Sequence, residues 1–395
     1  MADRVTYDWK LTSRSVSLPF RLFGKRFSAG VWVRRTEDKV VPPQSSLLDA
    51  STSARDARKY EYQPIPEGRC IRVLKLHAGV GNEPLHGTLS NLALIDDADY
   101  EALSYVWGAN LHADIIFLQD NRILSLGGNL ADALYSLRHK KKDRVLWIDA
   151  LCIDQENLEE KSSQIPLMAE IYAMASSVVV WLGKPTAHSQ TGLDILAFLA
   201  GSDKFDDNAP WNRMEIQDVI AAIRDIIDRH YFQRLWVVQE AALAQRVALN
   251  VGHLMLEWTG GLATRRFLAR IKLAELSPTW QKSDLKEIDF RPLRELLEQS
   301  LAAESRRNGR VELPSLLDVA HSIRNRQVTD HRDRIYGVMS LVTPAQVAGF
   351  VPDYTKSWEE TYLQFYDLVE RQVLEHPTIE LQDVLKHEQG ESASA

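Results

Sequence analysis

Residues 144–183, RVLWIDALCIDQENLEEKSSQIPLMAEIYAMASSVVVWLG, constrain the fold more than any other stretch of the chain. Continuous apolar runs occupy 145–148 and 178–182, and short runs rich in Val, Ile and Leu predict strands that are buried on both faces. Between the two runs, apolar residues recur at helical spacing, namely Ile165, Met168, Ile171, Tyr172 and Ala175. Strand, helix and strand in this order predict a βαβ unit with parallel strands and a right-handed crossover.

The helix between the two strands has recognisable start signals. Ser162 or Ser163 can cap it, and Pro166 is tolerated because it falls in the first turn. Ligands of parallel sheets bind beyond the carboxyl ends of the strands. Polar residues follow the first strand at that point, namely Asp149, Cys152, Asp154, Gln155 and Glu160.

Composition limits the class of protein. The 395 residues carry 45% apolar and 26% charged side chains, as expected of a soluble globular protein, and a net charge of −7 without a basic domain argues against nucleic-acid binding. The two cysteines, Cys70 and Cys152, are far apart in sequence and suit a reducing compartment. No apolar run reaches the ~20 residues of a membrane span, and the N-terminus lacks the apolar core of a secretory signal. We therefore expect a cytoplasmic protein without membrane or nucleic-acid partners.

Four segments are predicted along the chain. Residues 1–59 form a flexible, irregular arm, 60–255 an α/β core, 256–382 a helical C-terminal subdomain, and 383–395 a disordered tail. Strands followed by helices predict this division. Beside the βαβ unit, we expect strands at 69–76, 86–92, 100–107, 115–118, 122–126 and 247–251, and helices at 130–139, 192–200, 214–229, 230–244, 263–276, 291–301, 316–324, 334–341 and 357–374.

Three local signals refine these boundaries. Asp120 and Asn121 lie between two short strands, which predicts a hairpin with positive φ in its turn. Asn129 is the expected cap of the helix at 130–139. Ser357 and Glu360 have the spacing of a capping box at the start of the last helix.

The first candidate cluster is Ser104, Tyr105, Val106, Trp107 and Gly108, at the end of a predicted strand. A tryptophan followed by glycine can offer a flat stacking face while the backbone turns. The alternative is that Trp107 is a core residue at a tight turn.

The second cluster is acidic and extends from Asp149 to Glu160. These carboxylates contain no histidine and match no calcium-loop spacing, so hydrogen bonding to loop amides and helix capping are favoured over metal binding. Cys152 lacks a histidine base suggested by the sequence, which favours a buried structural thiol over a nucleophile.

The third cluster is at 234–240, RLWVVQE. Trp236 and Glu240 are four residues apart and share one helix face. A carboxylate drawn into the interior is costly unless it is paired or functional. Glu240 could therefore form an ion pair with Arg234 or Arg246, or it could face a sugar in a crevice.

Five blocks, in this order, resemble the fungal heterokaryon-incompatibility (HET) domain. They are YEALSYVWG at 100–108, LWIDALCIDQ at 146–155, EKSSQ at 160–164, MAEIYAMASSVVVWLG at 168–183 and YFQRLWVVQEAALA at 231–244. DHRDRIYGVMSL at 330–341 and PDYTKSWEETY at 352–362 resemble the region that follows this domain. One departure is Asp154, where the family usually has Asn, and a carboxylate there accepts hydrogen bonds but cannot donate them.

The resemblance implies a role in fungal non-self recognition and regulated cell death. HET domains are distantly similar to TIR domains, some of which cleave NAD, so it also implies a TIR-like or flavodoxin-like parallel sheet with a site at the strand ends. The TIR catalytic motif is Trp-Cys-x-x-Glu. Trp236 and Glu240 keep its spacing, whereas Val237 replaces the cysteine. By this match, Glu240 is the catalytic candidate.

NAD cleavage needs neither a metal nor a cofactor. Its transition state resembles an oxocarbenium ion and nicotinamide leaves as a neutral molecule, so one carboxylate can serve. Trp107 could stack on a base and Arg234 could face the pyrophosphate, whereas the absence of G-x-G-x-x-G argues against redox dinucleotide binding. The residues expected to bind substrate are Ser104, Tyr105, Trp107, Gly108, Asp149, Asp154, Gln155, Arg234 and Trp236.

Two other functions remain open. The chain could be a non-enzymatic interaction module, or a pseudo-enzyme that binds a nucleotide without cleaving it. Self-association through the α/β core is the expected trigger of activity.

Overall fold

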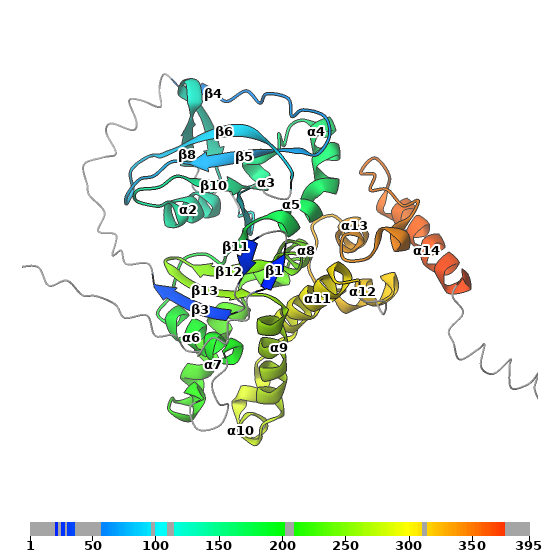
Figure 1. The fold of residues 1–395 in the computed structure, drawn as a ribbon. Helices are drawn as coiled ribbons and strands as arrows, with labels where there is room; N and C mark the ends of the chain where they lie inside the picture. Colours follow the sequence, from blue (N-terminus) through cyan, green and yellow to red (C-terminus); the bar gives the residue numbers. More distant parts are fainter. Residues whose placement is uncertain are drawn as a thin grey trace, which may run out of the picture.

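The computed structural model describes residues 57–95, 99–108, 114–201, 209–309 and 314–375, together with the backbone of short strands at 20–22, 25–27 and 30–35. A large mixed sheet lies among helices (Figure 1), which confirms the predicted α/β class. Its strands follow the order β3-β13-β12-β11-β7-β10-β5-β6-β8-β9-β4. Their bounds are β3 Gly30–Arg35, β4 Arg58–Lys59, β5 Cys70–Leu76, β6 Leu85–Ala93, β7 Glu101–Tyr105, β8 Asp114–Leu118, β9 Arg122–Leu126, β10 Arg144–Trp147, β11 Ser177–Trp181, β12 Arg246–Val251 and β13 Leu254–Thr259.

Four neighbouring strands, β10, β7, β11 and β12, are parallel and form the centre of the sheet. The two strands of the predicted βαβ unit, β10 and β11, are parallel as expected, and both pair with β7, which lies between them. Numbered along the chain, these four strands have the order 2-1-3-4, which is the flavodoxin-like arrangement. The order reverses between β7 and β11, so their carboxyl ends are where such a sheet binds ligands.

The strands on the β5 side are mainly antiparallel. β5 pairs antiparallel with both β10 and β6, and β8 forms a hairpin with β9. Asp120 and Asn121 have φ values of 59° and 54°, which confirms the predicted hairpin turn. Gly30–Arg35 lies within the stretch 1–59, for which we expected no regular structure, and it pairs with β13. A further hairpin joins β1 (Phe20–Leu22) and β2 (Lys25–Phe27).

The connection between β10 and β11 is broken into short pieces, not one helix capped at Ser162 or Ser163. Asn157 is the cap, because its Oδ1 accepts the N–H groups of Glu159 and Glu160 at 3.0 and 3.1 Å. Pro166 lies in the first turn of the short 3₁₀ helix η2, as tolerated there, but η2 stands between α4 and α5 and does not begin a single long helix. The pieces are α3 Asp149–Cys152, α4 Leu158–Gln164, η2 Ile165–Leu167 and α5 Met168–Met174.

Two further predictions of helices need correction. Residues 230–244 form η4 and α8, because the backbone between them pairs with Gln327. Asn129 does not cap α2, which starts after Gly127; it lies inside the helix and donates to the Val106 carbonyl at 2.7 Å. These and the other helices of the core are η1 Gln119–Asn121, α2 Gly128–Leu137, α6 Ser189–Ala200, η3 Pro210–Asn212, α7 Ile216–Ile227, η4 His230–Gln233 and α8 Trp236–Ala242.

The strand β13 was not expected, since we predicted helices only after the strand at 247–251. Gly252, with φ of 57°, turns the chain so that β13 pairs antiparallel with β12. Leu254, Leu256 and Trp258 are buried on one side of this strand. Alternation of this kind is a strand signal that was present in the sequence.

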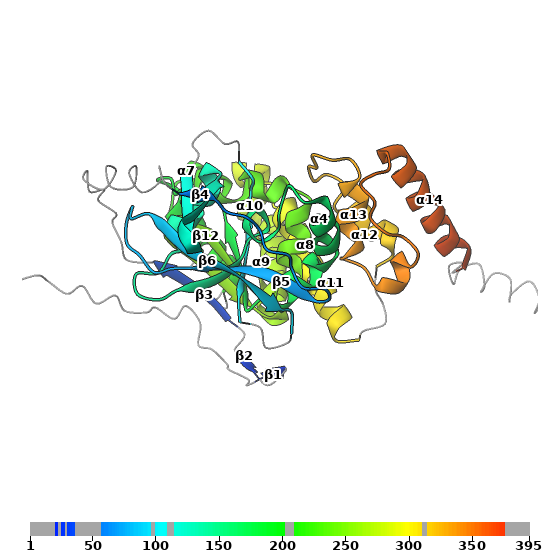
Figure 2. The ribbon, with the colours of Figure 1, turned by 90° about the horizontal axis from the view of Figure 1, so that it is seen from above.

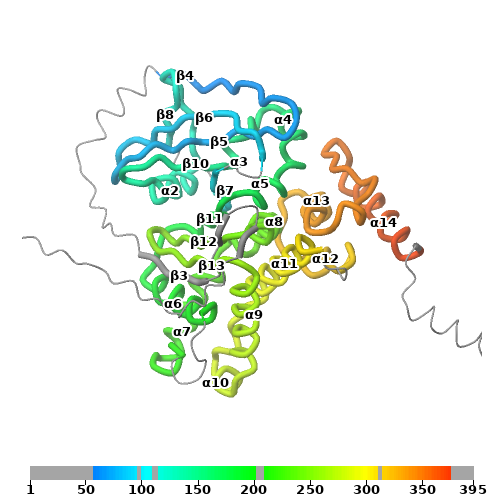
Figure 3. The backbone as a smooth tube through the Cα atoms, viewed as in Figure 1, coloured from blue at the N-terminus to red at the C-terminus, as the bar shows by residue number. Residues whose placement is uncertain are grey.

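Helices are the regular elements of the described residues after β13, as predicted. Figures 1 and 2 both place α12, α13 and α14 at one side of the sheet, with α14 outermost, and Figure 3 shows the path of the chain between them. Ser357 and Glu360 exchange the hydrogen bonds of the predicted capping box. The bounds are α9 Gly261–Leu276, α10 Pro278–Gln281, η5 Asp284–Glu287, α11 Arg291–Arg307, α12 Leu316–Ser322, α13 Asp333–Met339, η6 Pro344–Val347 and α14 Trp358–Glu375.

One apolar core extends through the sheet into these helices, from Ile71 and Val179 to Phe267 and Leu316. The segment after β13 therefore packs on the sheet rather than standing apart from it. Within the described residues, we find no helix with the length and apolar character needed to cross a bilayer.

Candidate functional site

The carboxyl ends of β7 and β10 bring two of the predicted clusters together. Trp107 follows β7 and donates its Nε1–H to Oδ2 of Asp149, which follows β10, at 3.0 Å. Trp107 is 50% exposed, so it is not a core residue, and its ring is accessible at the strand ends. Gly108 is exposed beside it.

Glu240 reaches the same region from α8. Its carboxylate accepts a short hydrogen bond from Oγ of Ser104, which lies on β7. The Ser104 hydroxyl also lies 2.8 Å from the hydroxyl of Tyr231. Glu240 is only 4% exposed and Ser104 is fully buried, so this hydrogen-bonded group lies in the interior of the protein.

One guanidinium acts on both carboxyl groups of the site. Arg234 donates Nη1–H to the Tyr105 carbonyl at 2.7 Å, which anchors it at the end of β7. Burial raises the pKa of Glu240 to about 7, while the charge of Arg234 and the Ser104 hydrogen bond act in the opposite direction. Burial likewise raises the pKa of Asp149 to about 6, opposed by hydrogen bonds from the Ala150 N–H and the Trp107 indole and then by the charge of Arg234. Raised carboxyl pKa values grouped around one cation are typical of functional sites.

The two expected ion-pair partners of Glu240 are engaged elsewhere. Arg246 pairs with Glu257 at 3.6 Å. Arg234 is held by the Tyr105 carbonyl and influences Glu240 through its charge. The carboxylate of Glu240 is therefore stabilised by the charge of Arg234 and by the Ser104 hydroxyl, and together they offset its burial only in part.

Trp236 points away from this group. Its Nε1–H donates to Oδ2 of Asp333, in the C-terminal helices, at 3.0 Å. The structure thus separates the two ends of the Trp236–Glu240 pair, one facing β7 and the other α13. Val237, which occupies the cysteine position of the TIR motif, is fully buried.

Asp154 and Gln155 organise the loop after α3. The Asp154 carboxylate accepts the Glu156 N–H at 3.1 Å. Gln155 donates Nε2–H to the Asp149 carbonyl at 2.8 Å and so fixes the backbone of Asp149. Each makes a hydrogen bond within the loop, as the structural alternative expects.

Cys152 is buried, and burial raises the pKa of its thiol to about 12. A thiol that stays protonated at neutral pH is a poor nucleophile. Its sulfur accepts the Ile148 N–H at 3.3 Å, which fits the structural role.

Two residues that sequence reasoning did not select for the site support it. Tyr231 completes the hydrogen bonds around Ser104. Asn129 joins the Val106 carbonyl to the Trp181 indole, whose Nε1–H it accepts at 2.9 Å, and so ties the ends of β7 and β11 together. Tyr231 lies in the quoted block at 231–244, whereas no sequence signal shows that Asn129 links two strands.

The arrangement has a defined chemical capacity. It offers a half-exposed aromatic ring, a cation anchored at the strand ends, and two carboxyl groups that ionise near neutral pH. A buried carboxylate of this kind can stabilise a developing positive charge. The indole of Trp107 can stack on a planar group.

Comparisons with known proteins agree with the resemblance found in the sequence. Residues 100–240 match the family model described as heterokaryon incompatibility protein (HET). The chain is also similar to the heterokaryon incompatibility protein 6, OR allele, of Neurospora crassa, with 28% identity over 336 residues. That alignment covers 73% of this chain and 49% of the relative, so the chain spans about half the length of the curated relative it matches. No solved structure matches the chain.

The matched residues begin just before β7 and end at Glu240, so they include the central parallel strands β7, β10 and β11 and the hydrogen bond between Ser104 and Glu240. The chain thus carries, at residues 100–240, a region that matches the HET domain.

Proposed function

We propose that this chain acts in fungal heterokaryon incompatibility, as a non-self recognition protein whose activation leads to regulated cell death. Two findings support the proposal: the HET domain at 100–240 and the similarity to a protein named for heterokaryon incompatibility. Expression of the full chain in a filamentous fungus should reduce viability when the chain is activated. Unimpaired growth under every activating pairing would contradict this.

The mechanism we propose is NAD glycohydrolysis through Glu240. The observation that carries it is the buried carboxylate, with its pKa raised to about 7, at the carboxyl ends of parallel strands beside Arg234. A structural carboxylate gains little from such a location, since burial opposes its ionisation and Arg234 and the Ser104 hydroxyl offset this only in part. A carboxylate that stabilises a cation gains a strong interaction there.

In this mechanism, the bond between nicotinamide and C1′ of the ribose breaks, and its electron pair leaves with nicotinamide. The positive charge that remains on the ribose is stabilised by the Glu240 carboxylate, and water then adds to C1′ and loses a proton. NAD⁺ and water give ADP-ribose, nicotinamide and a proton. Arg234 would attract the pyrophosphate, and Trp107 would stack on a base.

The test compares nicotinamide release by wild-type protein and by Glu240→Gln, which keeps the size of the side chain and removes its charge. Glu156→Gln is the matched control, because Glu156 is exposed and, within the part of the chain that the structure describes, its carboxylate pairs with Lys59 at the surface. Each protein is assayed when dilute and when clustered by fusion to a coiled-coil oligomer, since we propose that self-association activates the core. Release by wild type that Glu240→Gln lacks supports the mechanism.

One observation favours a second candidate function, a signalling module that acts by contact. Glu240 is 4% exposed and hydrogen-bonded to Ser104, so substrate must displace covering groups before it reaches the carboxylate. If the Glu240→Gln variant still triggers incompatibility, the module is correct. If NAD raises the melting temperature without turnover, the chain is a nucleotide-binding pseudo-enzyme.

A further inference from the structure

The segment from Phe232 to Trp236, here called the linker segment, joins η4 to α8 and carries Arg234. The C-terminal region forms hydrogen bonds with its backbone at Phe232, Gln233 and Leu235. The Phe232 carbonyl accepts Nη1–H of Arg326 at 2.7 Å, and the Leu235 N–H donates to the Gln327 carbonyl at 3.0 Å. Between them, the Gln233 carbonyl accepts the Gln327 N–H, so the two stretches pair in the manner of a short β-bridge.

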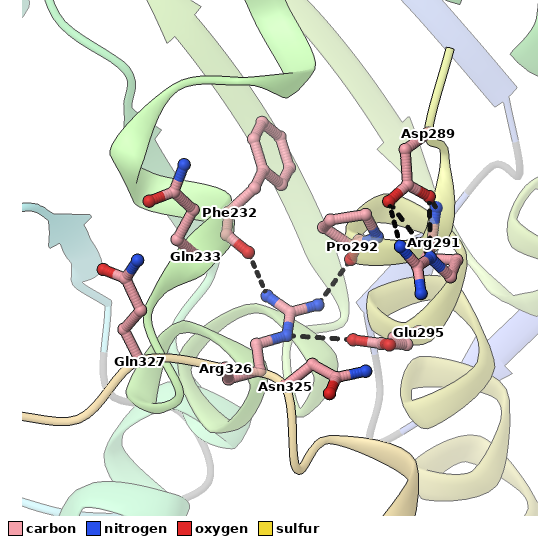
Figure 4. Close-up of a pocket in the computed structure, with 9 residues that line it drawn as sticks. All are labelled: Phe232, Gln233, Asp289, Arg291, Pro292, Glu295, Asn325, Arg326 and Gln327. Carbon is pink, nitrogen blue, oxygen red and sulfur yellow. Dashed lines mark hydrogen bonds and ion pairs between the residues drawn. The ribbon is translucent and has the colours of Figure 1, made fainter. Parts of the chain in front are cut away.

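Arg326 is built into this contact. It is 3% exposed, and its guanidinium also contacts the Pro292 carbonyl and Glu295, the latter at 3.1 Å. Figure 4 shows this guanidinium reaching both the Phe232 carbonyl and α11, at a hollow of about 340 Å³. The linker segment is therefore tied to α11 through the buried guanidinium of Arg326.

Asp333 is a second attachment, at the end of the linker segment. Its carboxylate accepts Nε1–H of Trp236 at 3.0 Å and the hydroxyl of Tyr354 at 2.8 Å. Arg332 donates to the Tyr354 carbonyl at 2.6 Å, and the Tyr336 hydroxyl contacts the Asp353 carbonyl at 3.0 Å. The blocks at 330–341 and 352–362 thus form one hydrogen-bonded unit against the HET domain.

Gly337 is a third attachment, through packing. A Cβ added at Gly337 would overlap Cδ2 of Leu235, which is 2% exposed. The absence of a side chain at 337 lets α13 lie directly on the linker segment, since close-packed interiors leave little space to adjust.

We propose that Asp333 and Gly337 are positioning residues for the candidate site: together with Arg326 they hold the linker segment so that Arg234 stays at the end of β7 beside Glu240. This assigns a task to the block at 330–341, which lies outside the matched HET domain. We call these three attachments, at Arg326, Asp333 and Gly337, the clamp. The purpose of the clamp rests on the proposed function, whereas the existence of the clamp does not, and the two tests below separate purpose from existence.

The first test measures amide hydrogen exchange of the full chain. Trp236→Phe removes the donor to Asp333, and we expect about tenfold faster exchange within 233–242. Trp280→Phe is the matched control, because Trp280 is also buried and its Nε1 has no hydrogen-bond partner among the described residues. Equal exchange of 233–242 in both variants would overturn the proposal, whether or not the protein cleaves NAD.

The second test is a rescue. Gly337→Ala should displace Leu235, and it should both speed exchange of 233–242 and lower nicotinamide release. Gly337→Ala combined with Leu235→Val, which lacks the overlapping carbon, should restore both. Loss of release in Gly337→Ala without rescue would contradict positioning through Leu235. If wild type releases no nicotinamide, the proposed function fails. The exchange rates of 233–242 in Gly337→Ala and in the double variant then still show whether the clamp exists.

Discussion

At the scale of single residues, the candidate site is set by a carboxyl group whose burial opposes its ionisation. The pKa of Glu240 rises from 4.5 to about 7, so the folded protein binds more protons than the unfolded chain between these values. Folding stability therefore falls as pH rises through this window, because the native state must ionise a buried group.

We predict that Glu240→Gln removes this pH dependence. Relative to wild type, the free energy of unfolding of Glu240→Gln should increase between pH 4.5 and 7, by at most on the order of 3 kcal/mol. Urea denaturation at a series of pH values measures the difference. Asp149, whose pKa is also raised, is present in both proteins, so its contribution to the pH dependence cancels in the comparison. The stability of Glu156→Gln should depend on pH in the same way as that of wild type. Parallel stability curves for wild type and Glu240→Gln would show that burial does not hold Glu240 protonated.

A second residue-scale prediction concerns Glu160, which sequence reasoning placed among the acids after β10. Glu160 forms a buried pair with Arg72 at 2.8 Å and accepts the Asp154 N–H at 2.7 Å. Glu160→Gln leaves the Arg72 charge without a counter-charge, so we expect a loss of about 3 kcal/mol in the free energy of unfolding.

The matched control is Glu170→Gln. Glu170 pairs with Arg69 at 2.7 Å, but both side chains are about half exposed, and such pairs contribute about 1 kcal/mol or less. Chemical denaturation of the two variants compares a buried and an exposed pair in one protein. Equal destabilisation would refute the assignment of Glu160 to the core.

At the scale of elements, strands were more predictable than helix boundaries. The runs at 145–148 and 178–182 became β10 and β11, and the turn at Asp120 has the expected positive φ. These signals are local, because a strand pattern and a turn residue express the conformation of the residues themselves. The predicted helix cap at Ser162 or Ser163 was wrong. Asn157, several residues earlier, accepts hydrogen bonds from the first amides of α4.

This difference makes a prediction. Asn157→Ala should lower the free energy of unfolding by about 1 kcal/mol, as expected for a lost N-cap. Ser162→Ala should change the free energy of unfolding by less than about 0.5 kcal/mol, because the Ser162 hydroxyl donates to the Leu158 carbonyl at an exposed helix surface. Thermal or urea unfolding of both variants decides which residue starts the helix. A larger effect of Ser162→Ala would favour the sequence-based assignment.

The break at 234–235 could not be predicted from local pattern. Residues 230–244 have helical spacing throughout, yet the Leu235 N–H bonds to Gln327, more than ninety positions later. Only the folded C-terminal region supplies that partner. β13, in contrast, was predictable, because Leu254, Leu256 and Trp258 alternate after the turn at Gly252.

At the scale of the whole molecule, the sequence allowed the candidate residues to be named but not all of their neighbours. Parallel strands predict that Trp107 and Asp149 meet at one edge, and they do. The approach of Glu240 to Ser104 requires α8 to pack against β7, which depends on contacts across 136 positions. The turn of Trp236 toward Asp333 depends on the C-terminal helices, and no spacing within 234–240 encodes it.

The most direct test of the central claim is the rate of nicotinamide release by clustered full-length protein at neutral pH, measured for wild type, Glu156→Gln and Glu240→Gln. If the buried carboxylate stabilises the ribosyl cation, wild type and Glu156→Gln release nicotinamide at the same rate, and Glu240→Gln is at least about a hundredfold slower. If all three proteins release nicotinamide at one rate, or none of them does, the carboxylate does not perform this chemistry.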